Sequence, residues 1–382
     1  MVRFVAKLNR PLLLVALVVA TIAMCIRSAG TTHTVFAEAF MATASPTLGT
    51  VQTARDDGAE LLYSETGKAS VQNGQFSPDG ADILFTLFHN GYNRGPAGLY
   101  RLNIAKRVVV RLLDEPDHDS VNLPGSSWLK ATGQIVFASD RADGLTEIWS
   151  LAPDTKLLKR ITDHLAMNAI YVFTEPSLSP DGRQIVFEAD LDNDVSTLWL
   201  VDADGTHLKN LMPGSKDKQP NWSPSGDKIL FQRQLSDGRW NLYTVRPDGE
   251  NIRPALAETA DDTDASWSPD GKWIVYSSTY GGRSHPAIFV APVGGKPIQI
   301  TYADAYSDYA PSWSPDGKWL LFESRQGDNE DVLTALWRIA APIMVLGTSS
   351  AIAARGSVSG PQLTPAPAPV TGWWHPYVNL TW

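Results

Sequence analysis

Short apolar runs separated by polar turns recur along most of this chain. Six times, an aromatic or leucine residue precedes a tight turn, and an apolar triplet ending in an aromatic ring follows. These anchor residues are Phe76, Trp128, Leu178, Trp222, Trp267 and Trp313. In five of the six repeats the turn is Ser-Pro-x-Gly, in which proline presets φ and glycine tolerates a positive φ. The spacing of about 45 residues indicates a structural repeat.

Further apolar runs follow each triplet. Leu99-Tyr100 belongs to the second run of the first repeat, and a third run often follows an Asp-Gly turn such as Asp204-Gly205. Short runs of β-branched and aromatic residues between such turns predict strands. With the strand that leads into each anchor, every repeat has four strands, which is typical of a propeller blade. We therefore predict an all-β fold, a six-bladed β-propeller with four strands per blade, over residues 58–340.

The sixth repeat lacks its outer strand, because the sequence after Ala340 turns rich in proline and alanine. Residues 59–64 stand at the right distance before the first anchor to supply that strand. We expect them to complete the last blade and close the ring, which removes exposed sheet edges. A helical fold is excluded because no long segment with a 3.6-residue period follows residue 30.

The N-terminal residues 1–30 resemble an export signal. Arg3, Lys7 and Arg10 precede an uncharged apolar run over residues 11–26. This pattern predicts a cleaved signal peptide, with an uncleaved membrane anchor as the alternative. Either would place the propeller outside the cytoplasm, in the periplasm or at the cell surface.

The segment between the signal and the propeller and the segment after the propeller differ in composition from the signal and from the propeller. Residues 31–57 are small and polar and predict a flexible spacer, whereas residues 341–382 form a Pro/Ala-rich tail with an aromatic end. The lone cysteine, Cys25, excludes an internal disulfide and a cysteine-based metal site. Its lipidation is a third alternative for attaching the chain to a membrane.

The net charge of −9 argues against nucleic-acid binding through a basic face. A basic protein or peptide, or a cation, is the more natural partner. A closed propeller of this kind is expected to be monomeric.

The segments Trp267–Ser277 and Trp313–Ser324 resemble the propeller repeats of the TolB family, the periplasmic component of the Tol–Pal system. The resemblance spans residues 58–340 and implies a propeller that binds protein partners. TolB proteins also carry an N-terminal α/β domain, for which this sequence leaves only about thirty residues between the signal and the first strand. The same repeat builds propellers of peptidases, lyases and binding proteins, so function has to be inferred from the site.

Carboxylates recur just ahead of the anchors of repeats three to six. Asp217, Asp262 and Asp308 stand five places before an anchor, and Glu175 and Asp264 stand three places before one. We expect all five at the mouth of the central channel, because the innermost strand of each blade precedes its anchor. Clustered negative charge would attract a basic peptide or a divalent cation to this face. No other cofactor is predicted.

Catalytic signatures are weak in this sequence. It has no Gly-x-Ser-x-Gly nucleophile elbow and no closely spaced histidine pair. The histidine-rich metal centre of the related oligogalacturonate lyases has no recognisable counterpart. We therefore predict a non-enzymatic binding scaffold. The alternative is a lyase or hydrolase with a metal or an acid pair, such as Asp262 and Asp264, in the channel.

Overall fold

The computed structural model describes the propeller and the short segment that leads into it. The described residues are 55–113, 118–164, 171–191, 195–213, 216–327, 329 and 332–342. The predicted signal or anchor, most of the predicted spacer and nearly all of the predicted tail therefore lie outside them. Within the described ranges, no helix is long and apolar enough to span a membrane.

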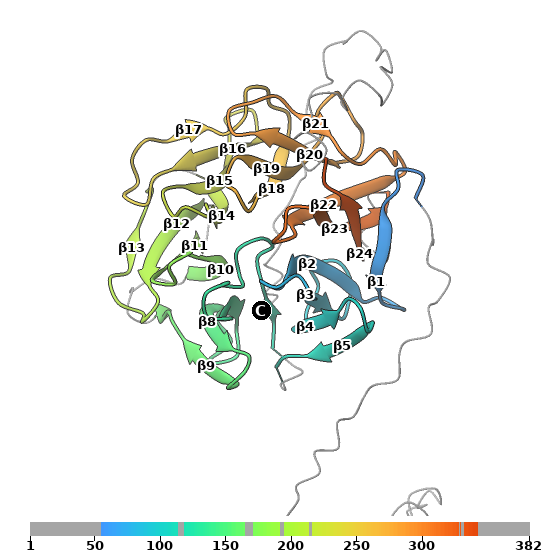
Figure 1. Ribbon diagram of the computed structural model, residues 1–382. Helices are drawn as coiled ribbons and strands as arrows, with labels where there is room; N and C mark the ends of the chain where they lie inside the picture. The colour runs from blue at the N-terminus through green and yellow to red at the C-terminus, as the bar shows by residue number, and fades with distance from the viewer. Residues whose placement is uncertain are drawn as a thin grey trace, which may run out of the picture. The chain divides into compact units, whose positions relative to one another are not determined.

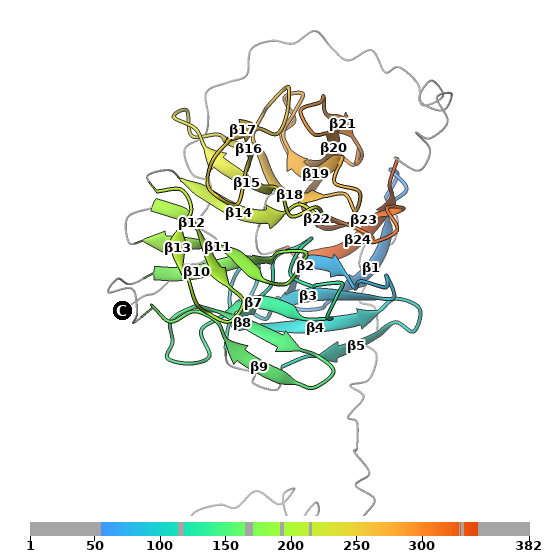
Figure 2. The same ribbon diagram turned by 60° about the vertical axis from the view of Figure 1, so that its left-hand side comes forward.

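Six four-stranded antiparallel sheets surround a central axis (Figures 1 and 2), which confirms the predicted propeller. Blade 1 contains β2 (Ser70–Phe76), β3 (Asp82–Phe88), β4 (Ala97–Asn103) and β5 (Val108–Arg111). Blade 2 contains β6 (Ser120–Val121), β7 (Ile135–Ser139), β8 (Glu147–Ala152) and β9 (Leu157–Arg160). Blade 3 contains β10 (Tyr171–Leu178), β11 (Gln184–Leu191), β12 (Val195–Asp202) and β13 (Lys209–Asn210).

The other three blades follow in chain order around the ring. Blade 4 contains β14 (Asp217–Trp222), β15 (Ile229–Gln234), β16 (Trp240–Val245) and β17 (Arg253–Pro254). Blade 5 contains β18 (Asp262–Trp267), β19 (Trp273–Ser278), β20 (Ala287–Pro292) and β21 (Ile298–Gln299). Blade 6 contains β22 (Tyr306–Trp313), β23 (Trp319–Gln326), β24 (Ala335–Ala340) and β1 (Glu60–Ser64).

Blade 6 is closed by the N-terminal strand, as the repeat count predicted. Strand β1 pairs antiparallel with β24, from Glu60 opposite Arg338 to Ser64 opposite Ala335. The two ends of the propeller sequence therefore share one sheet, and the ring cannot open without breaking this pairing.

The Ser-Pro-x-Gly turns are stabilised by their own serines. In blade 5, Ser268 Oγ donates to Asp270 Oδ1 at 2.6 Å and accepts from the Trp273 backbone N–H at 3.0 Å. Gly271 has a φ of +68°, which a residue with a side chain rarely adopts. The same geometry recurs in other blades, so each turn forms from local sequence alone.

The anchor residues join neighbouring blades. Trp267 of blade 5 belongs to the same buried cluster as Leu230 of blade 4, and Trp313 of blade 6 to the same cluster as Val275 of blade 5. Each such cluster mixes apolar side chains from two adjacent blades and removes them from water, which stabilises the ring.

Five of the six inner strands carry a β-bulge three residues before the anchor, where two residues oppose one on the second strand. The residue at this place has a positive φ in every blade. We call these the bulge positions: Asn73 (φ 55°), Gly125 (94°), Glu175 (51°), Gln219 (51°), Asp264 (53°) and Ala310 (47°). The bulge interrupts the two-residue alternation of the strand, so residues on either side of it need not face the same way.

Candidate functional site

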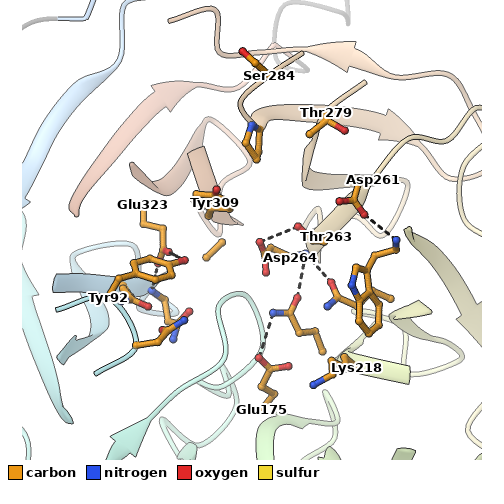
Figure 3. A pocket seen from close by; sticks show the side chains of 18 residues that line it. Tyr92, Glu175, Lys218, Asp261, Thr263, Asp264, Thr279, Ser284, Tyr309 and Glu323 are labelled. Atoms are coloured by element: carbon orange, nitrogen blue, oxygen red, sulfur yellow. Dashed lines mark hydrogen bonds between the residues drawn. The ribbon is translucent and has the colours of Figure 1, made fainter. Parts of the chain in front are cut away.

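A cavity of about 260 Å³ lies on the propeller axis (Figure 3). Its walls are formed by bulge positions of the inner strands and by the first polar side chain after the apolar triplet of the second strands. Its lining also includes the loop residues Thr279 and Ser284, of which Ser284 is exposed, and Trp240 at the start of β16. Both loop and strand side chains thus line the cavity.

A repeated hydrogen bond builds the wall. The bulge frees the backbone N–H of the bulge position, and a side chain from the second strand of the preceding blade accepts it. The pairs are Asn73–Glu323 Oε2 at 2.9 Å, Gln219–Glu188 Oε2 at 3.3 Å and Asp264–Gln232 Oε1 at 3.2 Å. The side chains of Glu323, Glu188 and Gln232 are therefore held in place by the backbone of the next blade.

One side of the cavity holds a buried group of charges. Glu188 binds the ammonium of Lys218 at 2.8 Å, and Asp190 lies 3.6 Å from the same nitrogen. Burial and repulsion by Glu188 raise the pKa of Glu175 well above its ordinary range and that of Asp190 to about 7. Burial opposes the charge of Lys218, but attraction to Glu188 and Asp190 outweighs it and raises the lysine pKa. Lys218 is thus the shared counter-ion of three carboxyl groups.

Glu323 forms the opposite wall. Its carboxylate accepts from the Asn73 backbone N–H and from the Tyr92 hydroxyl, each at 2.9 Å. Burial raises the pKa of Glu323 to about 7 although both hydrogen bonds lower it. Arg325 stacks on Tyr92, with its guanidinium carbon 4.2 Å from the ring centre, and on Tyr309 at 5.3 Å.

Of the five carboxylates predicted at the mouth, Glu175 and Asp264 line the cavity. Gln219 connects them: its side-chain amide donates to Glu175 Oε1 at 3.2 Å, and its oxygen accepts from the Asp264 backbone N–H at 3.1 Å (Figure 3). Burial raises the pKa of Asp264. Their binding role stays a prediction.

Asp217, Asp262 and Asp308 do not line the cavity, contrary to the expected placement. Each is fully buried inside its blade and faces its cross-strand neighbour. Asp217 forms a bidentate ion pair with Arg233, with nitrogen–oxygen distances of 2.6 and 2.8 Å. The hydroxyl of Ser278 donates to Asp262, whose pKa burial raises to about 6.

Asp308 binds a residue from the other end of the propeller sequence. Arg55 donates to both of its carboxylate oxygens, at 2.7 and 2.8 Å, and its guanidinium also faces the rings of Tyr306, Phe322 and Trp337. Arg55 is buried and lies ahead of residue 58, where we placed the start of the propeller. Arg55 therefore binds the segment before β1 to blade 6, in addition to the pairing of β1 with β24.

The bulge explains the misplaced carboxylates. On a regular strand, residues five and three places before the anchor would share one face. The extra residue at the bulge breaks that relation, so Asp262 points into its blade while Asp264, two residues later, points into the cavity.

A group of metal-ligand type lies elsewhere, in blade 2. Among the described residues, Glu147, Asp163 and His164 are the only such set of three within 4.8 Å of one another. Glu147 Oε1 already accepts from Arg160 at 2.7 Å and from His164 Nδ1 at 2.6 Å, and its other oxygen accepts from Thr162. A guanidinium at this distance repels a cation, so these residues do not fit a metal centre.

Sequence reasoning missed Glu188, Gln232 and Glu323, which accept hydrogen bonds from the bulge positions; of these, Gln232 and Glu323 line the cavity. A signal for them exists: each directly follows the aromatic residue that ends an apolar triplet, in Ile-Val-Phe-Glu, Ile-Leu-Phe-Gln and Leu-Leu-Phe-Glu. A polar residue at the end of a buried run marks a side chain that faces water or a cavity.

The sequence model described as the TolB beta propeller domain matches residues 58–255 and 234–351. Among solved structures, TolB from Acinetobacter baumannii is 16% identical, with 74% of this chain and 65% of that chain covered and a TM-score of 0.48. For a putative TolB from Agrobacterium tumefaciens the values are 19%, 71%, 90% and 0.50. For a gluconolactonase from Xanthomonas campestris they are 13%, 74%, 90% and 0.53. At such identities the structures show the fold alone, and this chain spans 65% of the A. baumannii protein.

Proposed function

This chain belongs to the TolB β-propeller domain family, and from that premise we propose that it is a non-enzymatic, extracytoplasmic binding protein. Its central cavity takes up a cationic group of a protein or peptide partner. Glu175 and Asp264 are the principal ligand-facing carboxylates, while Asp217, Asp262 and Asp308 support the blades behind them.

The charge balance of the cavity carries this proposal. Four carboxyl side chains line it, those of Glu175, Asp261, Asp264 and Glu323, against the single cation of Lys218. Burial raises the pKa of Glu175, Asp264 and Glu323, so these carboxyl groups hold protons until a cation enters the cavity. An entering cation favours their ionised form, displaces a proton and then gains more in this poorly solvated space than at an open surface.

The polar and aromatic lining fits the same ligand. Trp240 lines the cavity, and a cation is attracted to the face of such a ring. Tyr92 and Tyr309 line it as well, but Arg325 already stacks on both of their rings. Amide side chains, among them Gln72 and Gln219, supply further hydrogen-bond acceptors for an ammonium or guanidinium group.

The test compares a basic with an acidic probe. N-acetylated Gly-Lys-Gly amide and its Gly-Glu-Gly counterpart are titrated into the protein by calorimetry. The double variant Glu175→Gln/Asp264→Asn should bind the lysine peptide at least about tenfold more weakly, a loss of about 1.4 kcal/mol.

Asp237→Asn/Asp248→Asn is the matched control, because it removes the same two charges from exposed loops. It should leave the affinity unchanged. Equal affinity of the wild-type protein and the cavity variant for the lysine peptide would reject the proposal, as would preference for the acidic peptide.

The location outside the cytoplasm is supported by the basic and apolar N-terminal sequence, which lies outside the described residues. Cell fractionation of the tagged full chain tests it. The protein should be found in the periplasmic or membrane fraction, and replacing Leu13 and Leu14 of the apolar run by arginine should retain it in the cytoplasm. A wild-type chain found in the cytoplasm would contradict the proposal.

A second candidate function is general acid–base catalysis, as in a hydrolase or lyase. It is favoured by one observation: Asp190 and Glu323 have pKa values of about 7, which suits proton transfer near neutral pH. Incubation with chromogenic esters and glycosides tests it. Turnover that Glu323→Gln abolishes would support catalysis, and turnover equal in the variant would reject it.

A further inference from the structure

The central channel is closed below the cavity by a ring of uncharged polar residues. We call them the floor residues, which stand one place before each anchor: Gln75, Ser127, Ser177, Asn221, Ser266 and Ser312. All six are buried, none more than 5% exposed, and none of them lines the cavity. An open channel would expose them to solvent, so the cavity ends above this ring.

Floor residues bond across blade boundaries. Ser266 donates to the Pro311 carbonyl at 2.8 Å, and Ser312 donates to the Gly74 carbonyl at 2.7 Å. Such side-chain to backbone bonds between neighbouring blades hold the floor closed and satisfy its buried polar atoms.

A segment of blade 2, residues 123–126, crosses the axis and completes the floor. Asn221 of blade 4 donates to the Pro124 carbonyl at 3.0 Å, and Ser126 donates to Ser177 of blade 3 at 2.6 Å. A Cβ atom on Gly125 would lie 2.6 Å from the Cβ of Ser266, in blade 5 on the opposite side of the ring. Only glycine permits this approach.

The irregular second repeat explains why blade 2 supplies this segment. Its inner strand β6 has two residues, whereas the other inner strands have six to eight. The chain after Val121 is therefore free of the β-ladder and reaches the centre of the ring, where Figure 1 shows it in teal. Because the second repeat departs from the common pattern, its chain can complete the floor below the cavity.

The cavity above the floor contains an unsatisfied acceptor. Glu175 is 7% exposed, lines the cavity, and its Oε2 has no hydrogen-bond donor among the described residues. Burial and the neighbouring acid Glu188 raise the pKa of Glu175, so this group keeps a proton until a cation enters, displaces it and supplies the missing donor. The volume of about 260 Å³ is smaller than the roughly 300 Å³ at which pockets for drug-sized ligands begin, so it holds one or two residues.

We propose that the cavity is a blind cup that binds the free end of a primary ammonium group and excludes any chain that continues past the charge. This inference rests on the proposed function and specifies its ligand. The ammonium can be the α-amino terminus of a peptide or the tip of a lysine side chain. Its three N–H donors face Glu175 and Asp264 at the closed end, and the rest of the ligand leaves through the mouth.

Two isomeric amines test the cup without altering the protein. n-Hexylammonium carries its charge at one end, whereas di-n-propylammonium has the same atoms and charge but chain on both sides of the nitrogen. Affinities are measured by calorimetry. The primary amine should bind at least about tenfold more tightly, because the floor blocks the second chain. Glu175→Gln/Asp264→Asn should weaken its binding, which assigns it to the cavity.

Equal affinities, or tighter binding of the secondary amine, would overturn end-on recognition while leaving the acidic cavity as a binding site. Absence of saturable binding by both amines would overturn the proposed function together with this inference. Glycylglycinamide and Nα-acetyllysine methylamide then separate the two sources of the ammonium. Binding of either supports the cup, and binding of neither contradicts it.

Discussion

Glu323 is a buried acid whose partners compensate its charge only in part. It is 1% exposed and accepts one hydrogen bond from the Asn73 backbone and one from Tyr92. Burial nevertheless raises its pKa from the ordinary 4.5 to about 7. The substitution Glu323→Gln keeps the shape of the side chain and removes its titration, so it isolates the cost of this charge.

The magnitude follows from the two pKa values. One pKa unit corresponds to about 1.4 kcal/mol, so the ionised carboxylate is about 3.5 kcal/mol less favourable in the fold than in the unfolded chain. Because its pKa is raised, the folded state holds the proton more tightly, and this contribution to stability is fully present below pH 4.5. It is lost as the pH rises to about 7.

Urea unfolding followed by tryptophan fluorescence at pH 4.5, 5.5, 6.5 and 8 measures the effect. The free energy of unfolding of Glu323→Gln minus that of the wild type should increase by about 3 kcal/mol over this range. Other titrating groups cancel in the difference, and any lost hydrogen bond adds a constant offset. Glu60→Gln, the same substitution at an exposed position on β1, is the matched control.

A difference between Glu323→Gln and the wild type that stays constant with pH would refute this reasoning. A difference that falls as the pH rises would refute it as well. A constant difference would mean that the hydrogen bonds from Asn73 and Tyr92 compensate the charge of the buried carboxylate completely. A falling difference would mean that they outweigh the cost of burying it.

Three further outcomes are expected. Arg55→Ala leaves Asp308 buried without its cation and should lower the free energy of unfolding by about 3–5 kcal/mol. Arg338→Ala, at a partly exposed ion pair, should lower it by at most about 1 kcal/mol. Similar losses for the two variants in urea unfolding would contradict this. Ala310→Gly should raise the melting temperature, with a gain of up to about 1 kcal/mol, because φ is +47° there; a decrease would argue against backbone strain. Binding of n-hexylammonium should strengthen between pH 6 and 8, since Glu323 loses its proton near pH 7; calorimetry showing weaker binding at pH 8 would exclude that contribution.

Much of the fold could be predicted because its signals are local. A Ser-Pro-x-Gly turn such as that at Ser268 satisfies its own hydrogen bonds within six residues, and the apolar triplets identify buried strands without knowledge of their neighbours. The repeat count also located the missing strand at residues 59–64. The acidic character of the cavity was anticipated through Glu175 and Asp264.

The rest of the site depends on contacts that no local pattern encodes. Arg55 meets Asp308 only because the ring closes, since the two are 253 positions apart. Glu323 reaches the backbone of Asn73 across the junction between the last blade and the first.

The sequence by itself therefore determined the blades, their number and the closing strand, because turn geometry and strand burial act over a few residues. The tertiary structure decided which carboxylates face the axis, because a bulge changes the side of the strand to which the following side chains point. It also closed the channel, by bringing Gly125 of blade 2 against Ser266 of blade 5 across the ring. Ring closure sets that distance, and no property of either segment alone could have revealed it.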